Sequence, residues 1–186
     1  MNKPVKVLHV SRYYQTGGAA KSAFRLHEAL LEKGIDSSFI CLEENIEENA
    51  HQISLLKYYK SPENLFRRIK NKIARVLSKT FNTNQYKLQT ELKELLPKIN
   101  AELASLPFSN YALENHPLFN SFDIINLHWV ANEMLDYQCF FSSCKKPIVW
   151  TLHDMNPFQG IFHYKNDMLL NHAIAGKLDD FILNLK

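Results

Sequence analysis

The chain is poor in the residues that cross-link small domains. Its 186 residues include only three cysteines, Cys41, Cys139 and Cys144, and none is paired with another at C-x-x-C spacing. An odd and scattered set of cysteines argues against a disulfide framework and against a structural zinc site. We therefore expect reduced thiols that pack in the core or lie at the surface.

Long apolar runs are missing as well, and we expect no secretory leader. No stretch has the roughly 20 apolar, uncharged residues that a membrane-spanning helix needs. The start, MNKPVKVLHV, combines basic residues with a short apolar run but has no small-residue cleavage site. The sequence favours a globular protein that stays in the cytoplasm, free or peripheral on the inner face of the membrane.

Several motifs that mark common enzyme classes are absent too. The chain has no Walker A loop, no G-x-G-x-x-G, no G-x-S-x-G elbow and no H-E-x-x-H. These absences disfavour a P-loop enzyme, a serine hydrolase and a zinc protease. His128, His153, Asp154 and His163 are potential metal ligands, but no spacing places two of them on one element, so we predict no metal site.

The first 42 residues have the pattern of a strand, a loop, a helix and a second strand. VKVLHV at residues 5–10 is short, β-branched and largely apolar, as in a strand buried on both faces of a parallel sheet. After the loop SRYYQTGG, apolar residues recur at helical spacing as far as Gly34, which can cap the helix. SSFICL at residues 37–42 then predicts a second, parallel strand.

The same alternation of strand and helix patterns recurs late in the chain. Residues 121–130 and 145–154 are apolar runs with strand character, and residues 131–144 between them fit one helix. The predicted fold class is therefore α/β: a Rossmann-like, mostly parallel sheet with flanking helices, in a single domain that covers residues 1–186.

A helical insertion interrupts this sheet pattern. Leucine and isoleucine recur at helical spacing from about residue 60 to 108, and a helix-like tail follows from about 165 to 186. Residues 57–87 hold nine Lys or Arg and one Glu. Because aromatic residues are sparse there, an anionic membrane surface fits better than nucleic acid, and a solvated helix face fits equally well. The predicted membrane-surface residues are Arg67, Arg68, Lys70, Lys72 and Arg75.

Polar segments follow three of the predicted strands. Because parallel strands end at one edge of a sheet, residues 11–18, 128–132 and 153–160 should converge there. The glycine pair before the first helix suits either a phosphate site or a tight turn. His128 and Trp129 suit either ligand contact or core packing, and His153 lies where a rigid strand presents a side chain.

In combination, these segments resemble a known family. KVLHVSRYYQTGGAAKSAFRLHEALLEKG, FDIINLHWV and VWTLHDMNPFQGIFHY, in this order, look like the N-terminal half of bacterial GT-B-fold glycosyltransferases of family 4. The resemblance is strongest to the branch that builds capsular, colanic-acid-like or lipopolysaccharide chains, and it covers most of residues 5–164.

The resemblance implies an acceptor domain that faces a separate donor-binding domain. It implies a retaining transfer from a nucleotide-sugar, which is a substrate, with no metal and no other cofactor. By this match Gly17 and Gly18 lie near the donor diphosphate, and His153 is the catalytic histidine beside the transferred sugar. The residues that match the acceptor side are Ser11, Arg12, His128, Trp129 and Asn156.

The chain also departs from the family pattern. Asn126 stands where the branch often has the first histidine of H-x-H, and QGIFHY stands where it often has TGGCHY. The donor-binding C-terminal domain is absent from these residues, as in a truncated or split enzyme. We therefore expect sugar transfer in polysaccharide or lipopolysaccharide synthesis only when a donor-binding domain, for example on another chain, completes the site.

Two other functions remain open from the sequence. The chain can be a non-catalytic module that binds a sugar or lipid-linked acceptor, a membrane or a partner chain. It can also be a small Rossmann-like enzyme with His128 and His153 as an acid-base pair. A homodimer would cover the face that such a half domain exposes. The sequence assigns no role to His163.

Overall fold

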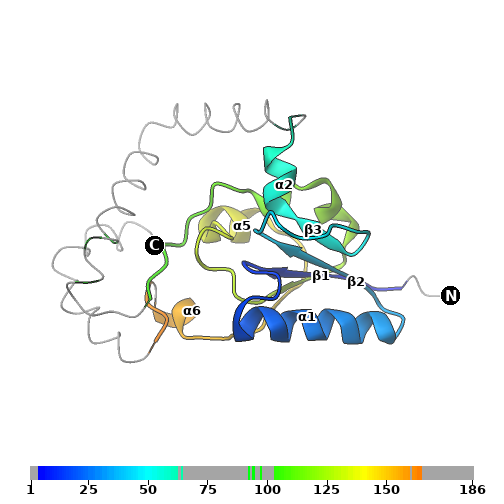
Figure 1. Cartoon of the computed structure of the whole chain (residues 1–186), viewed down its shortest axis with the longest axis horizontal. Helices are drawn as coiled ribbons and strands as arrows, with labels where there is room; N and C mark the ends of the chain where they lie inside the picture. Colours follow the sequence, from blue (N-terminus) through cyan, green and yellow to red (C-terminus); the bar gives the residue numbers. More distant parts are fainter. Residues whose placement is uncertain are drawn as a thin grey trace.

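The protein forms one five-stranded parallel sheet, as the computed structural model shows (Figure 1). The structure describes residues 4–62, 64, 92, 94, 97, 103–159 and 161–164. The sheet order is β3-β2-β1-β4-β5, and every neighbouring pair is parallel. The predicted Rossmann-like α/β fold is thus confirmed. The strands are β1 (Lys6–Ser11), β2 (Asp36–Cys41), β3 (Gln52–Ser54), β4 (Ile124–Leu127) and β5 (Ile148–Trp150).

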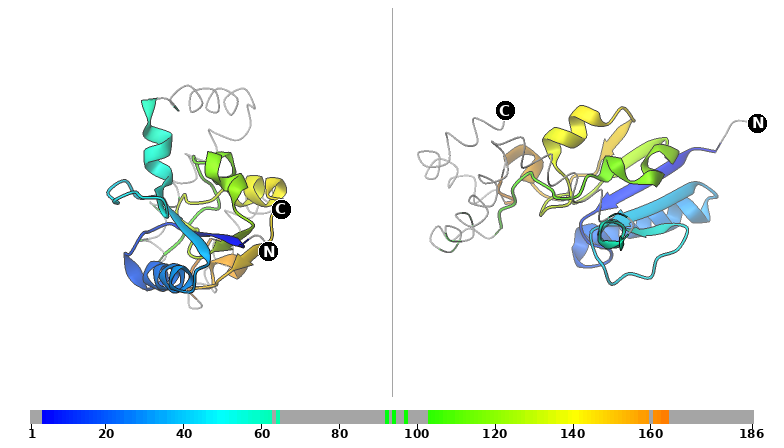
Figure 2. Two further views of the ribbon diagram at one scale, coloured as in Figure 1. Left: turned by 90° about the vertical axis from the view of Figure 1, so that its right-hand side faces the viewer. Right: turned by 90° about the horizontal axis from the view of Figure 1, so that it is seen from above.

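Helices lie on both faces of the sheet (Figures 1 and 2). The long helix α1 (Gly17–Glu32) covers one face, beneath β1 and β2. The shorter helices lie on the opposite face or beyond the carboxyl edge of the sheet. They are α2 (Leu55–Lys60), η1 (Leu113–Asn115), η2 (Pro117–Ser121), α5 (Tyr137–Ser143) and α6 (Asn156–Gln159).

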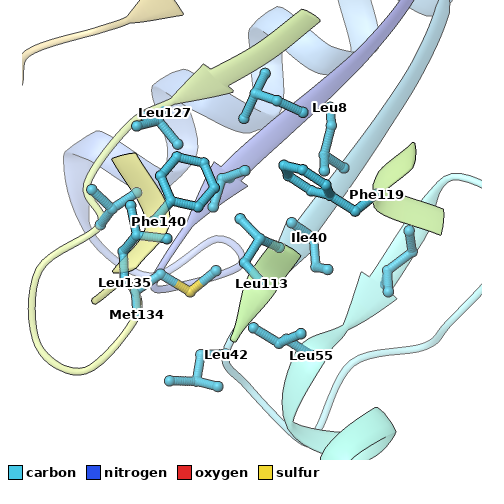
Figure 3. Close-up of a cluster of buried hydrophobic side chains, with 14 of the residues drawn as sticks. Leu8, Ile40, Leu42, Leu55, Leu113, Phe119, Leu127, Met134, Leu135 and Phe140 are labelled. Atoms are coloured by element: carbon cyan, nitrogen blue, oxygen red, sulfur yellow. The ribbon is translucent and has the colours of Figure 1, made fainter. Parts of the chain in front are cut away.

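The alternation of side chains along the strands builds a different core on each face. Leu8, Ile40 and Leu127 point away from α1 into a large apolar cluster, which Phe119 and Phe140 close from η2 and α5 (Figure 3). On the other face a smaller cluster joins the strands to α1. Its buried members are Ala23, Phe24, Phe39, Cys41 and Ile46.

Several predicted elements were longer than the elements in the structure. The helix predicted over residues 131–144 begins only at Tyr137, because Asn132 and Glu133 take positive φ values of 52° and 69° and turn the chain. Asp136 then caps α5 by accepting a hydrogen bond from the backbone N–H of Cys139 (2.9 Å). Strand β3 was missed, since three residues are too few to show a period.

The predicted insertion ends earlier than residue 108. Ala104 forms an antiparallel bridge with Phe162, and the backbone N–H of Ser105 donates to the carbonyl of Ile161 (2.8 Å). Leu106 precedes a proline, which disfavours helical geometry at that residue. Most of the insertion, the 165–186 tail and the five predicted membrane-surface residues, Arg67, Arg68, Lys70, Lys72 and Arg75, lie outside the described residues. Within the described ranges, no helix is long and apolar enough to cross a bilayer.

Candidate functional site

The carboxyl edge of the sheet has the topology of a ligand site. The chain runs from β1 outward to β2 and β3 and returns at β4, so the strand order reverses between β1 and β4. Open α/β sheets bind ligands at such a reversal. Here the backbone N–H of Arg12 donates to the carbonyl of Trp129, and that of Thr151 to the carbonyl of Leu127 (both 2.8 Å). The segments after β1, β4 and β5 therefore come together, as the sequence predicted.

Histidines form a row that leads from the interior to this edge. His128 Nε2 lies 3.1 Å from His9 Nδ1, and His128 Nδ1 lies 3.2 Å from His153 Nε2. Behind His9, the ring of His27 from α1 follows at 6.0 Å between centroids. His27 and His9 are 0% exposed and His128 is 3% exposed. Only His153 is partly exposed, so a ligand meets the row at that ring.

The buried rings of this row are neutral. Burial lowers the pKa of His9 to about 3 and the pKa values of His128 and His27 to about 4. Burial also lowers the pKa of His153. A neutral imidazole has one N–H and one lone pair, so each contact along the row joins the N–H of one ring to the lone pair of the next. His9 Nε2 and His27 Nε2 are buried and have no hydrogen-bond partner among the described residues.

Asn126 and Thr151 lie behind the row. Strand register places Asn126 directly beside His9, and the Asn126 amide nitrogen lies 3.3 Å from His9 Nδ1. The Thr151 hydroxyl donates to Asn126 Oδ1 (3.2 Å). His9 was not predicted from the sequence, and Asn126 was given no role there. A histidine inside a strand that is buried on both faces was the available signal.

A second cluster is built around the carboxylate of Asp154. Its Oδ2 accepts hydrogen bonds from Trp129 Nε1 and His163 Nδ1, both at 2.6 Å, and its Oδ1 accepts from the backbone N–H of Asn156 at 3.0 Å. His163 Nε2 in turn lies 2.8 Å from the Ser105 hydroxyl. We call these residues the Asp154 cluster. It joins the ends of β4 and β5 to the segment that begins at residue 103.

The contacts of the Asp154 cluster indicate a role for His163. Asp154, His163 and Ser105 follow the carboxylate, imidazole and hydroxyl order of a serine hydrolase. Ser105 is 6% exposed and His163 is 1% exposed, so a substrate does not reach the hydroxyl in this conformation. The three groups instead satisfy one another inside the fold. His163 is a structural residue that holds two loops together.

Several residues assigned to the acceptor side already have protein partners. The Arg12 guanidinium donates to the carbonyls of Leu42 (2.6 Å) and Asn132 (2.9 Å). Tyr13 stacks on Trp129 with 5.5 Å between ring centroids, so a sugar would first have to displace Tyr13. Ser11 and Asn156 are buried, at 0% and 4% exposure. Acceptor contact by Ser11, Arg12, Trp129 and Asn156 stays a prediction.

The glycine pair opens α1 at the same edge. Gly17 has φ of +84°, a value that favours glycine, whereas an added Cβ at Gly18 would meet no atom within 4 Å. Thr16 precedes the helix without a side-chain cap, and the first turn holds no acidic residue. These backbone N–H groups and the helix dipole suit a phosphate.

Neither metal ligation nor known relatives identify the site. Among the residues that the structure describes, no three side chains of His, Cys, Asp or Glu are arranged to hold a metal ion. His9, His128 and His153 lie in series, each bonded to the next. Comparison with family models, with curated proteins and with solved structures finds no match to this chain.

Proposed function

We propose that this chain supplies the acceptor-side half of a retaining, GT-B-type glycosyltransferase of polysaccharide or lipopolysaccharide synthesis. The observation that carries the proposal is the placement of His153. Its ring ends a hydrogen-bonded row at the reversal point of a parallel sheet, and it is the one member of that row that is partly exposed. A ring held in this way can hydrogen-bond a sugar hydroxyl during transfer.

The N-terminus of α1 supports the same proposal. Its uncapped N–H groups follow the loop after β1, and the absence of a side chain at Gly18 lets a diphosphate approach the backbone. A nucleotide-sugar could thus place its phosphates at α1 and its sugar near His153. The GT-B assignment itself comes from the sequence resemblance.

Transfer should require a donor-binding domain from outside these 186 residues. Positioning both reactants contributes about 7 to 11 kcal/mol to lowering a barrier, and one half of the site cannot supply it. The 186 residues alone should therefore show no turnover with UDP-, GDP- or dTDP-sugars, as measured by release of the nucleoside diphosphate.

Addition of a donor-binding domain should restore turnover, and His153→Ala should then lower kcat by a factor of about 100 or more. The partly exposed His51 lies before β3 and contacts the Ser37 carbonyl (3.0 Å) instead of a ring of this row, so it provides the control variant His51→Ala. Clear turnover by the 186 residues alone would contradict the requirement for a second domain.

One observation favours a second function, a partner-binding module. Exposed apolar side chains are frequent in one segment of the chain, residues 149–164, which includes part of the edge strand β5. They are Val149 (52%), Leu152 (47%), Met155 (41%), Phe158 (68%) and Tyr164 (41%). β5 is also an edge strand, with one side unpaired within the described sheet. Such a surface suits another protein chain.

If a second copy covers this surface, the mass in analytical ultracentrifugation should rise with protein concentration. Phe158→Glu should keep the protein monomeric, because a charge would have to be buried in the apolar contact. Leu118→Glu is the matched control, since Leu118 is also exposed (44%) but belongs to η2. A monomeric mass at every concentration would contradict self-association.

A further inference from the structure

The hydrogen bonds behind His153 have a direction, which follows from the orientation of the Asn126 amide. Its Oδ1 accepts a hydrogen bond from the Thr151 hydroxyl (3.2 Å). The other end of the Asn126 amide is therefore the NH2 group, which can only donate. It lies 3.3 Å from His9 Nδ1, so that nitrogen must be the acceptor and carry no proton.

The direction passes from His9 to His128. Because His9 Nδ1 has no proton, the 3.1 Å contact with His128 Nε2 requires the N–H of His128. His9 Nδ1 thus accepts from two donors, which fits distances above 3.0 Å. Burial lowers the pKa of His128 to about 4, so the ring is neutral and its Nδ1 has a lone pair.

The last step fixes the proton on His153. His128 Nδ1 can only accept, so the 3.2 Å contact requires the N–H of His153 Nε2. Neutral His153 then has no proton on Nδ1. No residue that the structure describes hydrogen-bonds to that nitrogen. It is the group that the row presents at the edge of the sheet.

We propose that the hydrogen-bonded row behind His153 fixes its tautomer, with the proton on Nε2 and a bare Nδ1 that accepts a hydrogen bond from a ligand hydroxyl. His9, Asn126, His128 and Thr151 are positioning residues, because they act through His153. A bare nitrogen accepts from a hydroxyl but cannot donate to a phosphate or a carboxylate. The tautomer does not depend on the proposed function, whereas the identification of the hydroxyl as a sugar's rests on it.

Long-range 1H–15N NMR of protein labelled with 15N-histidine tests the tautomer directly. Near neutral pH, His153 should show one tautomer, with a protonated Nε2 and a bare Nδ1. A rotated Asn126 amide would reverse every hydrogen bond in the row and place the proton on Nδ1. A protonated Nδ1, or two tautomers in exchange, would overturn the proposal.

Two variants of Asn126 separate positioning from packing. Asn126→Asp replaces the NH2 donor by an acceptor, so His9 Nδ1 must take the proton and the His153 tautomer should switch to Nδ1–H. Asn126→Ala removes the amide altogether, so nothing then directs the proton of His9, and it should give a mixture of tautomers. If either variant folds and still carries the His153 proton only on Nε2, the row does not fix the tautomer.

The ligand is tested on the same signals. In the presence of a donor-binding domain, UDP-glucose or GDP-mannose should shift the His153 Nδ1 resonance. UDP or GDP alone should not, because the proposed arrangement places the phosphates at α1 and only the transferred sugar near this nitrogen. A bare Nδ1 that responds to neither sugar nucleotide would leave the tautomer assignment intact and remove the support for a sugar site. A shift with UDP or GDP alone, which carry ribose hydroxyls and phosphates, would overturn the assignment of the hydroxyl to the transferred sugar.

Discussion

Acidification from pH 6.5 toward pH 4 should unfold the protein. In the unfolded chain a histidine has a pKa near 6.5, whereas burial lowers the pKa to about 3 at His9 and to about 4 at His27 and His128. Below pH 6.5 the unfolded state therefore binds more protons, and stability falls with pH until the folded pKa values are reached. Each such histidine costs about 1.4 kcal/mol per pH unit in that window.

Together the three histidines remove about 6 to 7 kcal/mol over two pH units, which is comparable to the whole stability of about 5 to 15 kcal/mol of a typical domain. Urea unfolding at a series of pH values measures this slope. His27→Gln removes one of the three groups, so it should lower the slope by about 1.4 kcal/mol per pH unit. A free energy of unfolding that stays flat below pH 6.5 would show that these rings are not buried in neutral form.

Asp154→Ala should be the most destabilising single change at the candidate site. The carboxylate accepts from Trp129 Nε1 and His163 Nδ1 (both 2.6 Å), and its removal leaves both donors without their acceptor. A buried donor without a partner costs about 1 to 3 kcal/mol. His163 is such a donor, whereas Trp129 is partly exposed and adds less, so the loss should be about 2 to 4 kcal/mol. Urea or thermal unfolding followed by circular dichroism measures it.

A graded pair of variants checks the mechanism. Asp154→Asn can keep a carbonyl oxygen toward Trp129 and His163, while its NH2 group faces the N–H of Asn156, so its cost should be smaller. Asp136→Ala removes a carboxylate that only caps α5, with an expected cost of about 1 kcal/mol. Equal losses for Asp154→Ala and Asp136→Ala would mean that the Asp154 cluster does not hold the loops.

The sequence could predict those parts of the fold that have a clear period. β1, α1 and β2 show the buried-strand and 3.6-residue patterns over enough residues, and the structure confirms them. The helix predicted over residues 131–144 begins only at Tyr137, because Asn132 and Glu133 have positive φ values that helical geometry does not allow. The spacing of apolar residues does not reveal such turns when no glycine marks them.

The candidate site was predictable only in outline. The ends of the predicted strands indicate that the loops with His128 and His153 come together, since parallel strands end at one edge of the sheet. The contact between His9 and Asn126 depends on the register of strands 117 residues apart, which local patterns do not encode. The role of His163 likewise depends on Ser105, 58 residues away in the chain.

The position of β1 in the middle of the sheet also governs when the protein can fold during synthesis. β1 emerges first from the ribosome, but its second neighbour, β4, follows only after β2, β3 and the residues between them, since Asn126 is 117 residues from His9. At a synthesis rate of about 5 to 20 residues per second, this interval lasts about 6 to 25 seconds. During that time one edge of β1 and the apolar side chains of Leu8 and Val10 lack the β4 side of their core. Until β4 arrives, the nascent chain therefore exposes apolar surface of the kind that promotes aggregation.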